Sequence, residues 1–134
     1  MEVLRVGFVG TRTSSVEATT SFFAQVMGLE VVRNDSSWSI LRLPSGPFDL
    51  FEVYGTDFDD ERLAPSDESL FVAFTVSDLD EARTEISAAG VDVGDVVWAA
   101  EAFNDPDLEG YGWFFFRAPD GRTYVIQQVP EHEA

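Results

Sequence analysis

The chain contains no cysteine, no lysine and a single histidine among its 134 residues. The missing cysteines exclude disulfides, thiolate nucleophiles and zinc sites built on sulfur, which is typical of an intracellular protein. We expect the one histidine, His132, to lie in a frayed polar tail rather than in a site. No apolar run approaches the roughly 18 residues that span a bilayer, and the start lacks a secretory signal pattern. These absences predict a cytoplasmic protein without membrane contact.

Positive charge is also scarce. Eight basic residues, all arginine, face 25 acidic ones, which gives a formal net charge of −17. Such a field repels phosphate backbones and anionic membranes, so we expect no nucleic-acid partner. Two interpretations stay open: a solvated acidic surface, or a field that attracts a cationic ligand. Gly-rich phosphate loops and Gly-x-Ser-x-Gly nucleophile motifs are both missing.

What the sequence does contain is an internal repeat. Phe8-Val9 returns as Phe71-Val72, and Gly28-Leu29-Glu30-Val31 returns as Gly90-Val91-Asp92-Val93. The offset is 63 residues at the phenylalanines (71 − 8) and 62 at the glycines (90 − 28), so one gap aligns both halves. We therefore predict one domain, 1–134, made of a module at 3–55, an acidic linker at 56–69 and a second module at 70–129.

Each half has the same order of elements. Ser14 or Ser15 is expected to cap the first helix and Asp78 the second, and Gly28 and Gly90 to end them. Turn compositions separate the remaining apolar segments. The sequence predicts helices at 16–27 and 79–89, and strands at 3–9, 30–33, 38–43, 48–54, 70–76, 91–99, 111–117 and 122–129. Each module thus reads βαβββ, and the fold class is α+β.

This repeat, together with the ending Trp113-Phe114-Phe115-Phe116-Arg117-Ala118-Pro119-Asp120-Gly121, resembles the vicinal oxygen chelate superfamily. That superfamily contains glyoxalase I, bleomycin-resistance and extradiol dioxygenase proteins. The resemblance runs from about residue 3 to residue 128. It implies two βαβββ modules whose curved mixed sheets form a cup.

The resemblance also implies a divalent metal in the cup, held by a histidine on the first strand and a glutamate on the last strand of each module. Those four positions fall on Phe8, Asp49, Phe71 and Val125, with Glu52 as the less favoured register for the second. Phenylalanine and valine offer no lone pair to a metal. We therefore expect no metal and no other cofactor, and Asp49 is the candidate catalytic carboxylate. The acidic stretches at 57–61 and 104–107 lack the spacing of a calcium loop.

Aromatic residues are abundant, at eighteen (three Trp, three Tyr, twelve Phe). Their flat apolar faces suit stacking on planar or cationic groups. The irregular segment 99–110 is a candidate rim over the cup. The candidate ligand-binding residues are Trp38, Asp49, Tyr54, Trp98, Phe103, Tyr111, Trp113 and Tyr124.

Two functions remain open. The first is a metal-free protein that sequesters a small aromatic or cationic compound, resembling the bleomycin-resistance branch. The alternative is a glyoxalase-like or dioxygenase-like enzyme, a lyase or isomerase, with a relocated or metal-independent site that uses Asp49 or Glu52. The resemblance further implies a homodimer, and the linker is long enough to allow modules to be exchanged between chains.

Overall fold

The computed structural model describes residues 1–56 and 70–130. The predicted linker, apart from residue 56, and the tail with His132 lie outside these residues. The first module contains β1 (Val3–Arg12), α1 (Val16–Gln25), β2 (Glu30–Asn34), β3 (Trp38–Arg42) and β4 (Leu50–Tyr54). The second contains β5 (Leu70–Val76), α2 (Leu79–Ala88), β6 (Val97–Trp98), α3 (Ala99–Ala102), a 3₁₀ helix, η1 (Pro106–Leu108), β7 (Gly112–Arg117) and β8 (Thr123–Gln128). The predicted βαβββ order is present in both halves.

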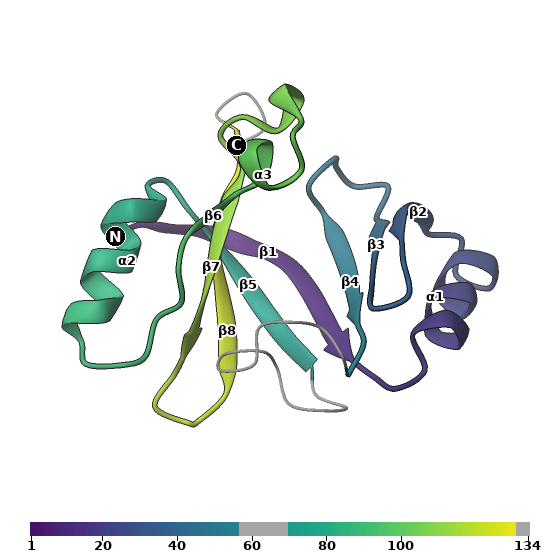
Figure 1. Cartoon of the computed structure of the whole chain (residues 1–134), viewed down its shortest axis with the longest axis horizontal. Coiled ribbons are helices and arrows are strands. Elements are labelled where there is room, and N and C mark those ends of the chain that lie inside the picture. The colour runs from purple at the N-terminus through teal and green to yellow at the C-terminus, as the bar shows by residue number, and fades with distance from the viewer. Residues whose placement is uncertain (57–69, 131–134) are drawn as a thin grey trace.

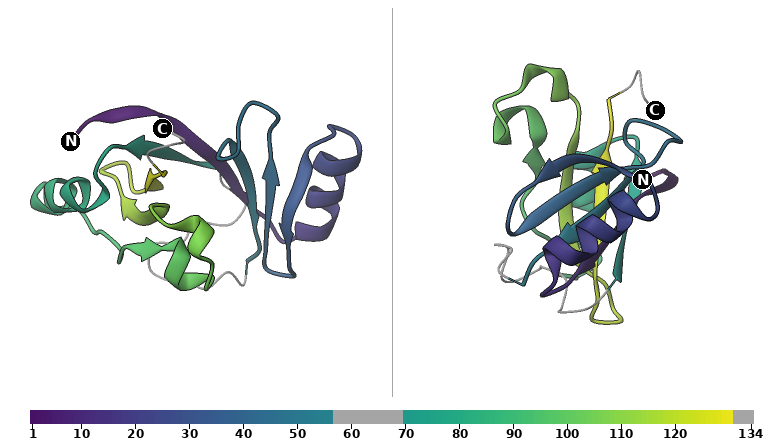
Figure 2. Two further views of the ribbon diagram at one scale, coloured as in Figure 1. Left: turned by 90° about the horizontal axis from the view of Figure 1, so that it is seen from above. Right: turned by 90° about the vertical axis from the view of Figure 1, so that its right-hand side faces the viewer.

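All eight strands form one mixed sheet in the order β2-β3-β4-β1-β5-β8-β7-β6. The order reads as two equivalent halves. β1 pairs with β4 in parallel, β5 pairs with β8 in parallel, and β1 and β5 meet antiparallel at the centre. The sheet is strongly curled into a half-barrel, with α1 and α2 at opposite ends of the molecule (Figures 1 and 2). The predicted α+β fold with a curved mixed sheet is confirmed.

The two faces of β4 decide which side chains enter the cup. Leu50 and Tyr54 belong to the cluster that also contains Phe8, whereas Val53 packs with Val16 of α1. Because successive side chains of a strand point to opposite faces, Glu52 shares the concave face with Leu50 and Tyr54. β4 therefore brings a carboxylate into the concave face of the sheet.

The two helices are anchored differently at their N-termini. The Asp78 side chain accepts a hydrogen bond from the Glu81 N–H at 3.0 Å, as predicted. Ser15 precedes α1, but its side chain makes no capping hydrogen bond, so the predicted serine cap is wrong. Instead the Ser15 N–H donates to the Thr13 hydroxyl, which holds the chain before the helix in a local turn.

The segment 91–99 differs most from its prediction as a strand. Only Val97–Trp98 forms a ladder with β7, and Val93 makes one isolated bridge to Phe116. The reason lies at Gly94, whose N–H donates to the Phe115 carbonyl and whose own carbonyl accepts from Arg83 of α2. The Gly94 carbonyl is thus bonded to a side chain of α2 instead of to a neighbouring strand. The predicted irregular segment 99–110 in turn contains α3 and η1.

Two smaller findings concern membrane-spanning helices and the end of α1. Within residues 1–56 and 70–130, no helix combines the length and the apolar content needed to cross a membrane. α1 ends at Gln25, two residues before the predicted end, and Gly28 follows with a positive φ of 76°. That left-handed conformation is the one in which glycine ends helices without strain.

Replacing Asp78 with alanine is expected to lower the free energy of unfolding by about 1 kcal/mol, because the Glu81 N–H loses its capping acceptor. Ser15→Ala is the matched control. It removes a side chain at the equivalent position of α1 that makes no capping bond, so the loss should be under half as large. Urea unfolding of the two variants measures the difference. Equal losses would contradict this account of the caps.

Candidate ligand-binding cavity

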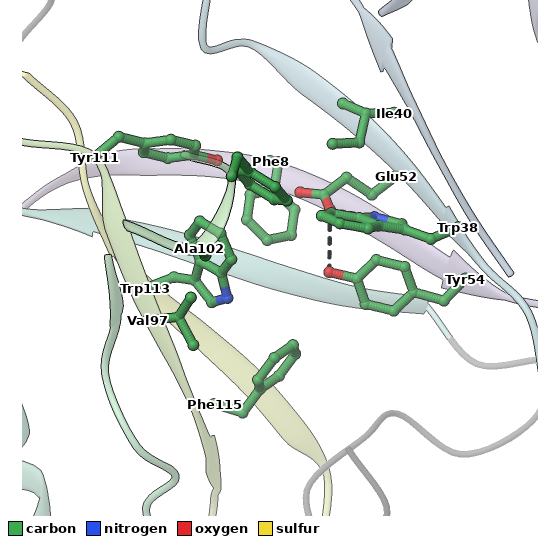
Figure 3. Close-up of a pocket in the computed structure, with 11 residues that line it drawn as sticks. Phe8, Trp38, Ile40, Glu52, Tyr54, Val97, Ala102, Tyr111, Trp113 and Phe115 are labelled. Carbon is green, nitrogen blue, oxygen red and sulfur yellow. Dashed lines mark hydrogen bonds between the residues drawn. The ribbon is translucent and has the colours of Figure 1, made fainter. Parts of the chain in front are cut away.

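The concave face of the sheet holds a cavity of about 260 Å³. Side chains from both modules converge on it (Figure 3). The first module supplies residues of β1, β3 and β4, and the second supplies residues of β6, α3 and β7 and of the segments that flank them. The lining residues are Phe8, Trp38, Ile40, Glu52, Tyr54, Val97, Ala102, Phe103, Tyr111, Trp113 and Phe115.

Glu52 is the one charged side chain in this lining, and it is only 3% exposed. Its Oε1 atom accepts two hydrogen bonds, from Trp38 Nε1 at 2.9 Å and from the Tyr54 hydroxyl at 3.0 Å. No other hydrogen bond or ion pair reaches this carboxylate from the residues that the structure describes. Its Oε2 atom is therefore left with unused acceptor capacity beside the cavity.

Burial raises the pKa of Glu52 to about 7, although the hydrogen bonds from Trp38 and Tyr54 favour the charged form. The carboxyl group therefore exchanges its proton near neutral pH. A buried carboxylate without a counter-ion is costly, so the cavity favours either a proton or a cation at this point.

Tyr111 lies across the cavity from Glu52. It immediately precedes β7, and its hydroxyl points toward Phe8 and the carboxylate (Figure 3). Burial first, and then the negative charge of Glu52, raise the pKa of the Tyr111 hydroxyl above its ordinary value. The phenol thus keeps its proton, and its oxygen can both donate and accept a hydrogen bond.

Aromatic rings close the cavity between the two modules. The Phe103 ring lies 5.9 Å from the Trp38 ring and 6.2 Å from the Trp113 ring, measured between centroids. The Arg33 guanidinium lies over the Trp38 ring at 4.7 Å and over the Phe103 ring at 4.9 Å, without lining the cavity itself. These rings already hold a cation, in the geometry of a cation–π contact.

The structure brings five of the predicted ligand-binding residues together around the cavity. They are Trp38, Tyr54, Phe103, Tyr111 and Trp113. Whether they bind a ligand stays a prediction. The other three predicted residues lie elsewhere, each for a reason that the structure shows.

Asp49 precedes β4 and borders a different groove, beside Phe23 and Met27 of the α1 region. Its carboxylate pairs with Arg5 at 3.3 Å and is 31% exposed. The structure corrects its predicted place in the cup. Asp49 and Glu52 are three residues apart, and an odd spacing in extended chain directs two side chains to opposite faces of the sheet. Glu52 is the one that points into the cavity.

Trp98 and Tyr124 lie on the other side of the sheet. Trp98 packs against Gly112, where a Cβ atom would approach the indole to 2.6 Å, and joins the core under α2. Tyr124 stacks on Phe74 and Phe116, with centroids 6.4 and 5.9 Å away. Neither residue lines the cavity.

The four positions expected to hold a metal can be compared through the strand registers. Gly10 pairs with Glu52 between β1 and β4, and Ala73 pairs with Val125 between β5 and β8. Since residues 10 and 73 are equivalent in the repeat, Glu52 and Val125 are equivalent as well. The structure thus assigns this position to Glu52, the less favoured register in the sequence, rather than to Asp49.

These positions do not fit a metal ion. Phe8 and Phe71 meet edge to face, with centroids 6.1 Å apart, and fill the space between the strands. Glu52 is then the only one of the four positions with a donor atom. Among the residues that the structure describes, no group of three or more acidic or histidine side chains is arranged to hold a metal. In the predicted acidic stretch at 104–107, Asp105 instead accepts from the Asp107 N–H and begins η1.

Solved structures share this fold. The Mn(II)-bound glyoxalase from Novosphingobium aromaticivorans superposes with a TM-score of 0.68 at 20% identity, over 94% of this chain and 39% of that one. Homoprotocatechuate 2,3-dioxygenase from Brevibacterium fuscum, in complex with 3,4-dihydroxyphenylacetate, gives 0.68 at 16%, over 96% and 37%. A hypothetical protein from Bacillus halodurans C-125 gives 0.62 at 16%, over 95% of both chains. This chain therefore spans about two fifths of the first two structures.

None of the curated proteins matches the chain in a sequence comparison. A family model, however, matches residues 5–123, which is most of the chain. The resemblance seen in the repeat and in the aromatic ending is thereby confirmed. The chain belongs to the Glyoxalase/Bleomycin resistance protein/Dioxygenase superfamily.

Proposed function

We propose that this protein binds a small planar or cationic compound in the cavity and does so without a metal, as a sequestering protein of the bleomycin-resistance type. The observation that carries the proposal is the Glu52 carboxylate, buried among aromatic rings with one oxygen free of hydrogen bonds from the described residues. The three other positions expected to hold a metal carry Phe8, Phe71 and Val125.

Ionised Glu52 lacks a counter-charge among the described residues. Ionised Glu52 loses most of its hydration, and no described arginine forms an ion pair with it. A cationic ligand would restore the missing counter-charge and stack on Trp113 and Tyr111. One solved structure of this fold, a dioxygenase, is a complex with 3,4-dihydroxyphenylacetate, a compound with one planar ring.

Small aromatic compounds, neutral and cationic, are expected to raise the melting temperature, because a ligand that binds only the folded state stabilises it. Trp113→Ala should weaken the affinity of any such compound about tenfold, since a ring facing the cavity is lost. Trp98→Ala is the matched control and should keep the affinity, because Trp98 lies outside the cavity. Calorimetry measures both. A panel without binders, or equal losses in the two variants, would overturn the proposal.

The raised pKa of Glu52 predicts a pH-dependent stability. Between pH 4.5, the ordinary pKa, and about 7, the folded protein holds a proton that the unfolded chain has released. Stability contributed by this group therefore falls as pH rises through that window, by up to about 3 kcal/mol. Urea unfolding of Glu52→Gln and of the unchanged protein measures the difference. The variant should gain relative stability from pH 4.5 to 8, and a constant difference would contradict the burial of a titrating carboxyl group.

The homodimer remains a prediction. Among the described residues, most of the exposed large apolar side chains belong to the first module. Val26, just after α1, is 69% exposed and Val6 of β1 is 53% exposed. In a chain with a net charge of −17, such apolar surface offers a place where two copies can meet with little repulsion. Sedimentation equilibrium should give twice the mass of one chain. A mass near that of a single chain would contradict the dimer.

One observation favours the alternative, a metal-independent lyase or isomerase. A carboxyl group with a pKa near 7 suits a general base, and Glu52 has an oxygen directed to the cavity. Asp49 no longer supports this function, because it borders another groove. The test is exchange of C–H hydrogens next to the carbonyl group of small aryl ketones in D₂O with a chelator present. Exchange above the rate with Glu52→Gln would favour catalysis.

A further inference from the structure

We propose that the ligand presents a protonated primary or secondary amine to the free oxygen of Glu52, with the Tyr111 hydroxyl as the second acceptor of its N–H groups. This inference rests on the proposed function and narrows its ligand to one chemical class. It excludes carboxylates, which the buried acid repels. Quaternary ammonium ions lack N–H donors and are therefore expected to bind with lower affinity than amines.

Glu52 has one oxygen that receives no hydrogen bond from the described residues. Both protein donors, Trp38 Nε1 and the Tyr54 hydroxyl, reach the same oxygen, Oε1. A carboxylate has about four acceptor sites on its two oxygens, so Oε2 keeps its full capacity. A donor that also carries positive charge satisfies this atom best, because charge-assisted hydrogen bonds are roughly twice as strong as neutral ones.

The cavity wall opposite Glu52 carries the Tyr111 hydroxyl. The Tyr111 hydroxyl points into the cavity toward Glu52. This hydroxyl makes no hydrogen bond with residues 1–56 or 70–130. It stays protonated, so its oxygen is a neutral acceptor as well as a donor. An ammonium group has up to three N–H donors. One can reach Glu52 and another Tyr111, whereas an alcohol offers only one.

Two aromatic rings of the cavity lining, Trp38 and Phe103, already contact a cation. Trp38 and Phe103 already carry the Arg33 guanidinium within 5 Å of their centroids, at 4.7 and 4.9 Å. These aromatic faces therefore tolerate a cation in the folded protein. Trp113 lies next to Phe103, at 6.2 Å, and also lines the cavity, which extends the same type of surface to a ligand.

Calorimetry at pH 8 with four compounds that share one ring tests the amine. They are phenethylamine, its N,N,N-trimethyl derivative, phenethyl alcohol and phenylacetate. We expect phenethylamine to bind at least tenfold more tightly than each of the others. Equal binding of the alcohol or of the trimethyl compound would overturn the inference and leave the proposed function standing. Failure of all four to bind would overturn both.

Variants test which atoms carry the preference. Glu52→Gln keeps an acceptor for Trp38 and Tyr54 but removes the charge. It should reduce the affinity for phenethylamine at least tenfold and affect the affinity for the uncharged phenethyl alcohol much less. Asp49→Asn is the control, since this carboxylate pairs with Arg5 outside the cavity, and should change neither affinity. Tyr111→Phe should cost phenethylamine three- to tenfold. An unchanged affinity in Glu52→Gln or in Tyr111→Phe would overturn the assignment.

Discussion

The pair of hydrogen bonds on Glu52 Oε1 is the interaction on which the cavity depends. A buried carboxylate needs donors. Trp38 Nε1 provides one from the neighbouring strand β3 and the Tyr54 hydroxyl provides the other from β4 itself. To donate there, the indole and the phenol must both turn inward, where their rings meet edge to face at 6.0 Å. The two hydrogen bonds to Glu52 thus orient the Trp38 and Tyr54 rings that line the cavity.

The repeat explains why only one side of the cavity carries a charged residue. The registers make Glu52 equivalent to Val125 and Tyr54 equivalent to Gln127. In the second module, Gln127 is fully buried and donates to Thr75 rather than to a charged group. The two halves keep the same burial pattern along these strands but differ in chemistry. Among the residues that line the cavity, Glu52 is therefore the one with a charge.

The fold could be predicted from the sequence because the repeat and the turns fix the order of elements twice over. The register of β4 could not be read so directly, because Leu50, Phe51 and Val53 are apolar on both faces of the strand, so alternation gives no direction. Tyr124 was a different case. Once Val125 is placed in the cup, its neighbour must point away, and this parity was available from the sequence. The strand expected at 91–99 is mostly absent, and there Arg83 of α2 donates a hydrogen bond to the Gly94 carbonyl, a contact that the pattern of the segment itself does not reveal.

The three metal positions without donor atoms and the carboxylate of Glu52 together set the charge of the cup. A cup with four donors balances their charge with a divalent ion, whereas a cup with one carboxylate needs a single positive charge. A proton supplies it up to about pH 7, because burial raises the pKa of Glu52 to about 7. A monocation competes with that proton for the same oxygen, and above pH 7 the cation no longer has to displace it. The net charge of −17 acts in the same direction, because a negative field raises the local concentration of cations around the mouth of the cavity.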